Sequence, residues 1–203
     1  MSAHEHYFSA EPASPGELRP LRVRLRGREV SVQVAAGVFS GDRLDLGTRV
    51  LLDAVDDPPA TGTLVDVGCG WGPLTVAMAQ ASPEARVVAV DVNARARDLT
   101  ARNAAALGLG NVTVLDPAEA LGQLPGGIDE IWSNPPIRIG KEALHELLRT
   151  WLSRLAPDGR AHLVVQRNLG ADSLHRWLAE ELGTDVTRTA SSKGFRVLTV
   201  RPR

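Results

Sequence analysis

The sequence predicts an α/β fold in which a mostly parallel sheet is covered by helices on both faces. From about residue 63 onward, short apolar runs rich in β-branched residues alternate with Ala- and Leu-rich segments of helical length. Nearly continuous apolar strands are typical of a sheet that is buried on both sides. A glycine-rich turn directly after the first of these runs is typical of ligand sites in such folds.

Seven strands are expected in the core, at 63–67, 85–90, 112–115, 128–132, 160–166, 185–191 and 195–201. Helices are expected over residues 74–81, 94–107, 141–155 and 173–182. The last two strands are joined by Ser192-Lys193-Gly194. So short a turn containing glycine predicts a hairpin, and the last strand should therefore run antiparallel.

The first sixty residues have a different pattern. Residues 21–34 alternate apolar and polar side chains around Gly27-Arg28, which predicts a β-hairpin with one polar face. Residues 37–55 lead from a loop into a short helix, which the Asp-Asp-Pro-Pro of residues 56–59 ends. We expect residues 1–60 to form an extension packed on the core, and residues 61–203 to form the main domain.

The composition excludes several classes of protein. Of the 203 residues, 43% are apolar and 23% are charged, with a formal net charge of −1. The one cysteine excludes a disulfide framework and a cysteine-rich zinc site, and no metal site is expected. Membrane-span and secretion-signal patterns are absent, so a cytoplasmic location is expected. With near-neutral charge, any nucleic-acid binding must come from a local patch.

The glycine turn follows the first core strand as Gly68, Gly70 and Gly72. A dinucleotide site requires Gly-x-Gly-x-x-Gly, whereas here the third glycine comes one position early and Pro73 takes its place. The pyrophosphate interpretation is thereby weakened. The turn either brings the backbone close to another ligand or simply connects a strand to a helix.

Acidic residues follow the second and third strands. Asp91 lies about 20 residues after the glycine turn, where a carboxylate suits the ribose of an adenosine-bearing cofactor. It could instead cap the following helix, as could Asn93. Asp116 could accept a hydrogen bond from an adenine amino group, or it could be a turn residue before Pro117.

The fourth strand ends in an unusual corner, Asn134-Pro135-Pro136. Two consecutive prolines donate no backbone hydrogen bond and end any strand or helix. The corner is either a plain turn or a rigid support that presents an amide oxygen and a backbone carbonyl to a ligand.

Taken in order, these motifs resemble those of class I S-adenosylmethionine-dependent methyltransferases. DVGCGWGPL (66–74), VVAVDVN (87–93), LD (115–116) and SNPPI (133–137) are similar to their glycine-rich, ribose, adenine and catalytic motifs. More narrowly, the chain resembles the methyltransferase small domain family, which includes bacterial ribosomal-RNA guanine-N2 methyltransferases. HYFS (6–9), the FS-x-x-x-x-D-x-G-T segment (39–48) and SSKGFRVL (191–198) extend the resemblance to short, stand-alone members.

The resemblance implies a Rossmann-like class I methyltransferase fold with S-adenosylmethionine as the cofactor. The residues that it places at the cofactor are Phe39, Asp45, Thr48, Asp66, Gly68, Cys69, Gly70, Asp91, Val92, Asp116 and Asn134.

The resemblance also implies that Asn134, Pro135 and Pro136 are the catalytic residues. The amide oxygen of Asn134 and the carbonyl of Pro135 could each accept one hydrogen of an amine, which aims the nitrogen lone pair at the methyl group. Both acceptors would stabilise the positive charge that develops on the amine. No titratable base is needed, because the proton can leave after the transfer.

The next two residues depart from the family pattern. Many amino-methyltransferases carry an aromatic residue after the two prolines, whereas this chain has Ile137 and then Arg138. Ile137 could cover a base by apolar contact, and Arg138 could stack on it or contact a phosphate. Lys193 is either a substrate contact or a solvated turn residue.

Three arginines alternate with apolar residues in the predicted hairpin, namely Arg22, Arg24 and Arg26. On a strand this spacing places all three on one face. That face is either solvated or contacts the RNA backbone.

The expected function is methylation of the exocyclic amine of a guanine in ribosomal RNA. A protein glutamine, a DNA adenine or a small-molecule amine is an alternative acceptor, since the Asn-Pro-Pro motif does not separate them. A nicotinamide oxidoreductase predicts an intact dinucleotide glycine pattern, which is absent. A non-catalytic binding module predicts a damaged cofactor motif or Asn-Pro-Pro motif, and neither motif is damaged.

Overall fold

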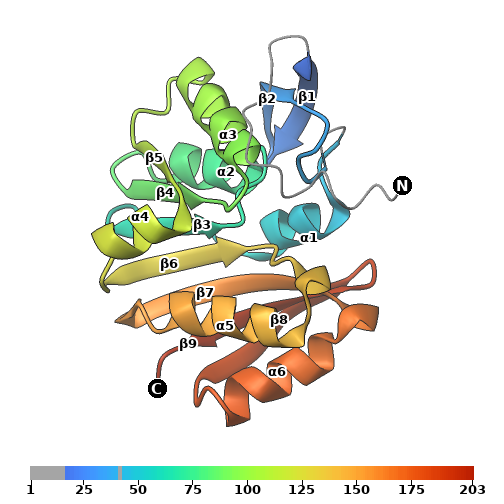
Figure 1. Ribbon diagram of the computed structural model, residues 1–203, viewed down its shortest axis with the longest axis vertical. Coiled ribbons are helices and arrows are strands. Elements are labelled where there is room, and N and C mark those ends of the chain that lie inside the picture. The colour runs from blue at the N-terminus through green and yellow to red at the C-terminus, as the bar shows by residue number, and fades with distance from the viewer. Residues whose placement is uncertain (1–16, 41–42) are drawn as a thin grey trace.

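The fold is described from a computed structural model, in which residues 17–40 and 43–203 are described. The HYFS motif (6–9) and residues 41–42 of the FS-x-x-x-x-D-x-G-T segment lie outside these residues. In the described chain a seven-stranded sheet has the order β5-β4-β3-β6-β7-β9-β8, and β1 and β2 form a separate hairpin (Figure 1). The strands are β1 (Arg19–Leu25), β2 (Arg28–Val34), β3 (Thr63–Val67), β4 (Arg86–Val90), β5 (Val112–Leu115), β6 (Ile128–Ser133), β7 (Leu155–Gln166), β8 (Asp185–Ser192) and β9 (Phe195–Arg201).

The expected strand directions are confirmed. Strands β3 to β7 pair in parallel, whereas β9 runs antiparallel to both of its neighbours, β7 and β8. The strand order turns back on itself at β3, which lies between β4 and β6. In sheets of this type, ligands bind at the carboxyl ends of the strands beside such a switch point.

Helices cover both faces of the sheet (Figure 1). One face is packed by α1, α2 and α3 together with the hairpin, and the other by α4, α5 and α6, which gives two apolar clusters separated by the sheet. The helices are α1 (Leu46–Ala54), α2 (Pro73–Ala81), α3 (Ala94–Ala106), α4 (Pro117–Gln123), α5 (Lys141–Leu152) and α6 (Ala171–Glu180), with short 3₁₀ turns η3 (Ile137–Ile139) and η4 (Arg167–Leu169).

The hairpin turn is at Arg26-Gly27, one residue earlier than the predicted Gly27-Arg28. Leu25 pairs with Arg28, and both turn residues have positive φ, 46° and 83°. A two-residue turn of this kind matches the twist of the flanking strands. The apolar face of the hairpin, which includes Leu25, Val30 and Val32, is buried against the core.

Two elements differ from the sequence prediction. Helix α4 was not predicted, because seven residues give too little periodicity; its start is set by Asp116 as the N-cap and Pro117 in the first turn. Strand β7 begins at Leu155 instead of residue 160, so that α5 ends at Leu152 and not at residue 155. Ile128 pairs with Leu155 but Glu130 pairs with Arg160, so the register between β6 and β7 shifts and extra residues of β7 bulge out of the pairing. A pattern of alternating side chains does not reveal such a bulge.

None of the helices in the described chain has the length and apolar content that a membrane span requires.

Candidate active site

The glycine turn lies at the carboxyl end of β3, where Gly68, Gly70 and Gly72 all have positive φ. The amides of Gly68 and Cys69 donate to the carbonyl of Val90, which joins the ends of β3 and β4. A methyl group added at Gly68 would contact nothing within 4 Å, whereas one at Gly72 would lie 3.1 Å from the Thr100 side chain. The first glycine therefore faces open space and the third faces the packed helix α3.

Asp66 lies near the end of β3, two residues before Gly68, and is fully buried. Its Oδ2 accepts hydrogen bonds from the backbone N–H and the hydroxyl of Thr75, at 2.9 and 2.6 Å. Its Oδ1 is buried and has no partner among the described residues. Burial raises the pKa of the Asp66 carboxyl to about 7, although the bonds from Thr75 oppose this shift. The unused oxygen is therefore an acceptor that a ligand group could satisfy.

Asp91 links the turn to the second strand. Its Oδ2 accepts from the N–H of Gly70 at 3.0 Å, and its Oδ1 accepts from the N–H of Asn93 at 2.9 Å. Asn93, and not Asp91, caps α3 by accepting from Arg95. Burial raises the pKa of Asp91, against the effect of these hydrogen bonds and of Arg97. The capping alternative for Asp91 is thus wrong.

Cys69 lies within the turn and is buried. Burial raises the pKa of its thiol well above the usual range, with the Asp91 and Asp66 carboxylates adding to the shift. The side chain is therefore a neutral thiol and not a nucleophile.

Asp116 is the N-cap of α4 and accepts from the amides of Ala118 and Glu119 through Oδ1. Asp116 therefore has a structural role as a helix cap, where the sequence had suggested a turn residue, and its Oδ2 takes no part in these bonds. Val92, beside Asp91, is 60% exposed, which is high for an apolar side chain at a strand end.

Asn134 lies at the carboxyl end of β6, and its amide group contacts the start of α1. Its Nδ2 donates to Oδ2 of Asp45 at 2.8 Å and to Oγ1 of Thr48 at 3.1 Å. Below it, the hydroxyl of Ser133 donates to the carbonyl of Val67 at 2.6 Å, which joins the ends of β6 and β3. The sequence assigned Asp45 and Thr48 to the cofactor and did not foresee that they contact the amide of Asn134.

A narrow cleft brings these elements together. It is lined by Phe39, Ser40, Asp45, Thr48, Gly68, Cys69, Gly70, Trp71, Pro73, Leu74 and Asn134. The segment before α1, the glycine turn and Asn134 are far apart in the sequence but line the same cleft. Among the described residues, no group of three or more His, Cys, Asp or Glu side chains is placed to hold a metal ion.

Cationic side chains from three loops lie at the same edge of the sheet. Arg138 in η3 and Lys193 in the β8–β9 turn are exposed, and Lys193 has a positive φ of 50°. A third cation, Arg167, was not predicted from the sequence. Its backbone N–H donates to the carbonyl of Gly194 at 2.8 Å, which joins the loops after β7 and β8. A basic residue directly after the predicted strand 160–166 was the available signal. Ile137 is half-buried and packs on the α4–α6 side.

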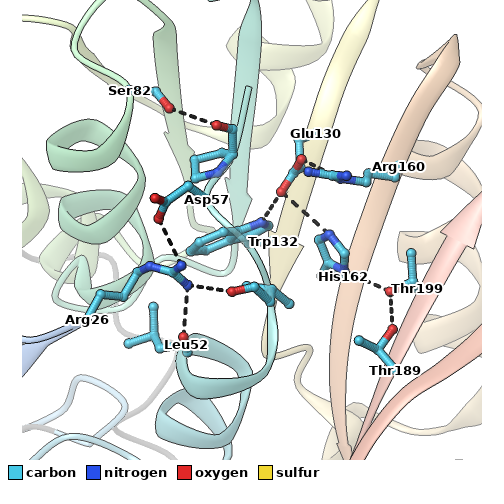
Figure 2. A network of polar contacts seen from close by, with 12 residues as sticks. Arg26, Leu52, Asp57, Ser82, Glu130, Trp132, Arg160, His162, Thr189 and Thr199 are labelled. Carbon is cyan, nitrogen blue, oxygen red and sulfur yellow. Dashed lines mark hydrogen bonds and ion pairs between the residues drawn. The ribbon is translucent and has the colours of Figure 1, made fainter. Parts of the chain in front are cut away.

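The prediction that Arg22, Arg24 and Arg26 share one exposed face is wrong for Arg26. Arg22 and Arg24 are exposed on β1, but Arg26 has entered the turn and its side chain is only 20% exposed. Its guanidinium donates to the carbonyls of Leu52 and Val55 and to Asp57, each at 2.8 Å, and lies 5.7 Å from the ring of Trp132 (Figure 2). These contacts satisfy the last carbonyls of α1, so Arg26 anchors the hairpin and is not free to contact a substrate.

The chain is similar to known methyltransferases over most of its length. The profile of the methyltransferase small domain family matches residues 29–199. The chain is 31% identical to the uncharacterized protein YbxB of Bacillus subtilis (strain 168), covering 96% of each. It is 33% identical to ribosomal RNA small subunit methyltransferase C of Pseudomonas syringae pv. syringae (strain B728a), covering 90% of this chain and 54% of that protein.

Solved structures give a consistent result. The T. thermophilus 16S rRNA N2 G1207 methyltransferase (RsmC), in complex with AdoMet and guanosine, superposes with a TM-score of 0.79 and 26% identity. The match covers 95% of this chain and 52% of that one. The expected Rossmann-like fold is thereby confirmed. The chain spans about half the length of the ribosomal-RNA methyltransferases that it matches.

Proposed function

Because this chain belongs to the methyltransferase small domain family, we propose that it transfers a methyl group from S-adenosylmethionine to the exocyclic amine of a guanine in ribosomal RNA. One observation carries the proposal. Both amide hydrogens of Asn134 are directed to Asp45 and Thr48, so that its Oδ1 is left to accept from a substrate amine. The names of the similar ribosomal-RNA methyltransferases support this choice of substrate.

The residues around the glycine turn fit the cofactor. The open space at Gly68 allows close approach to the backbone, and the unpartnered buried Oδ1 of Asp66 suits an ammonium group. Asp91 would accept from the ribose hydroxyls, with Asp116 at the adenine. The proposed cofactor site also includes Phe39, Cys69, Gly70 and Val92. Asp45 and Thr48, which the sequence also assigned here, lie in the same cleft.

Catalysis requires the chain to position an amine. Bound S-adenosylmethionine supplies an activated methyl group. Asn134 Oδ1 and the Pro135 carbonyl each accept one amine hydrogen and thereby direct the lone pair. Pro135 and Pro136 carry no N–H that would compete for these acceptors. As the amine becomes positively charged, the two oxygens stabilise it more strongly than they stabilise the neutral ground state.

RNA would approach over the carboxyl edge of the sheet. Arg138, Arg167 and Lys193 are exposed on separate loops there, and none has an ion-pair partner in the described chain. We propose that they contact phosphates while Ile137 covers one face of the target base. Arg22 and Arg24, which are exposed on β1, would form a second contact with the RNA.

We further propose that residues 1–60 act as an extension of a methyltransferase domain formed by residues 61–203. A ribosomal-RNA substrate would place the reaction in the cytoplasm.

The test is transfer of tritium from labelled S-adenosylmethionine to ribosomal subunits, naked ribosomal RNA, DNA and total protein, followed by nucleoside analysis. Asn134→Ala is the matched control for background labelling. We expect label in N2-methylguanosine of ribosomal RNA with the wild-type chain only. Label confined to protein or DNA would overturn the RNA proposal and keep the chemistry. No Asn134-dependent label in any fraction would overturn both.

A further inference from the structure

We propose that Asp45 is a positioning residue of the reaction, which fixes the orientation of the Asn134 amide from the N-terminus of α1. The inference rests on the proposed function, in which Asn134 Oδ1 accepts from the substrate amine. It changes the role that the sequence suggested for Asp45, which was contact with the cofactor.

The orientation of the Asn134 amide follows from the donors and acceptors around it. An ionised carboxylate only accepts hydrogen bonds, so the group that faces Asp45 Oδ2 at 2.8 Å must be the NH₂ of Asn134. The Thr48 hydroxyl, at 3.1 Å, accepts the second hydrogen of the same NH₂. No described residue donates to Oδ1 of Asn134. The amide is therefore bonded on its nitrogen side only, with its oxygen directed away from α1.

The orientation matters because the two ends of an amide have opposite hydrogen-bonding character. If the side chain rotated by half a turn, it would present two donors to a substrate amine, which is itself a donor. Such a pairing leaves both groups unsatisfied in a partly buried cleft. A negative carboxylate behind the NH₂ also polarises the amide and makes its oxygen a stronger acceptor.

Asp45 is itself held in place by two features of α1. Its Oδ2 accepts from the N–H of Thr48 at 2.9 Å, which makes it the N-cap of the helix. The first turn of α1 also packs closely against β9, because a methyl group added at Gly47 would lie 2.9 Å from the ring of Phe195. The carboxylate thus reaches Asn134, which is 89 residues away in the sequence, from a helix whose position is fixed by the sheet.

Two substitutions of Asp45, together with one control variant, separate its possible roles. Asp45→Asn retains an oxygen that can cap α1 and accept from Asn134, but removes the charge. Asp45→Ser retains a good N-cap while its side chain is too short to reach Asn134. Asp129→Asn is the matched control, since Asp129 also accepts from a backbone N–H, that of Thr63 at 2.7 Å, but at the opposite edge of the sheet.

We expect Asp45→Ser to lower kcat by about tenfold to a hundredfold, as for loss of a charge-assisted hydrogen bond, with the Kd of S-adenosylmethionine within about twofold. Asp45→Asn should recover most of the lost kcat, and Asp129→Asn should retain wild-type kcat. If Asp45→Ser instead weakens S-adenosylmethionine binding with kcat unchanged at saturation, Asp45 is a cofactor contact and the proposal is overturned. Equal kcat in Asp45→Ser and wild type also overturns it.

A second measurement needs no substrate. In ¹⁵N spectra, the side-chain NH₂ signals of Asn134, identified by their loss in Asn134→Asp, should shift in Asp45→Ser and remain in place in Asp129→Asn. Unshifted signals would exclude the contact itself. Because this readout is independent of methyl transfer, it tests the proposal even if the wild-type chain labels none of the acceptors, which is the failure of the proposed function.

Discussion

The backbone N–H of Gly70 donates to Oδ2 of Asp91 at 3.0 Å, so that one carboxylate joins the glycine turn after β3 to the end of β4. Its other oxygen accepts from Asn93, which caps α3. The carboxylate therefore sets the shape of the turn and, in the proposed complex, would also accept from the ribose.

Asp91→Ala should weaken S-adenosylmethionine binding by roughly ten- to a hundredfold, because a charge-assisted hydrogen bond contributes about 1.5–3 kcal/mol. Titration calorimetry measures the Kd directly. Asp98→Ala, which removes the partly exposed ion-pair partner of Arg102 on α3, is the control and should leave the Kd unchanged. The ribose assignment fails if the Kd of Asp91→Ala equals that of the wild type.

Asn134→Ala should lower kcat by about 10²–10³-fold, because in the proposed reaction it would remove an acceptor that stabilises the charge developing on the amine. The Kd of S-adenosylmethionine should stay within a few-fold, since the side chain is proposed to contact the substrate. Single-turnover methylation of the substrate found by tritium transfer, together with calorimetry, checks both quantities. A wild-type rate would mean that Asn-Pro-Pro is only a structural corner.

Replacing Arg138, Arg167 and Lys193 together by Gln should flatten the dependence of log affinity on log salt by about 2, because each contact with a single-strand phosphate contributes about 0.7 to the slope. S-adenosylmethionine binding should not change. Filter binding of ribosomal-RNA fragments over a salt series gives the slope, and coincident slopes would remove these residues from the RNA path.

Arg22→Gln with Arg24→Gln tests the hairpin by the same assay. Two phosphate contacts would flatten the slope by about 1.4. Arg24 lies opposite Glu29 in the hairpin, which weakens its local positive potential. An unchanged slope, with stability altered by no more than about 0.5 kcal/mol, would identify these arginines as a solvated face.

His162 should make the fold sensitive to acid. Burial lowers its pKa to about 4, with the Arg160 and Arg201 charges adding to the shift, and its Nδ1 lies 2.9 Å from Thr199 Oγ1 (Figure 2). Because the unfolded chain binds a proton at His162 more readily than the folded chain does, neutral His162 contributes to the free energy of unfolding. This stabilisation is fully present above about pH 6.5 and is lost as the pH falls toward 4. It amounts to about 3 kcal/mol at most.

Urea unfolding between pH 4 and pH 7 of the wild type and of His162→Gln measures this effect. The free energy of unfolding should fall less steeply with acid in His162→Gln than in the wild type. Burial raises the pKa of the neighbouring Glu130, which acts in the opposite direction, so the difference between the variant and the wild type is the quantity to compare. Identical slopes in His162→Gln and wild type would contradict the prediction.

The sequence by itself determined the order and type of most elements. Apolar runs of β-branched residues located β3, β4, β5 and β6 within one residue. The reason is that a strand buried on both faces has apolar side chains at consecutive positions, which form a run that is visible in the sequence. It also placed the glycine turn, Asp91, Asp116 and Asn134 at strand ends, since a glycine, a carboxylate or a proline after a run marks where that run stops.

Only the tertiary structure decided which of these residues meet. Arg26 alternates correctly with Arg22 and Arg24 in the sequence, yet the turn begins one residue early and sends its side chain to the end of α1. Asp45 reaches Asn134 because α1 packs across β7 and β9, and no local pattern encodes a contact over 89 residues. Local preferences specify a residue's own backbone, whereas the partner of a polar side chain depends on how separate elements pack.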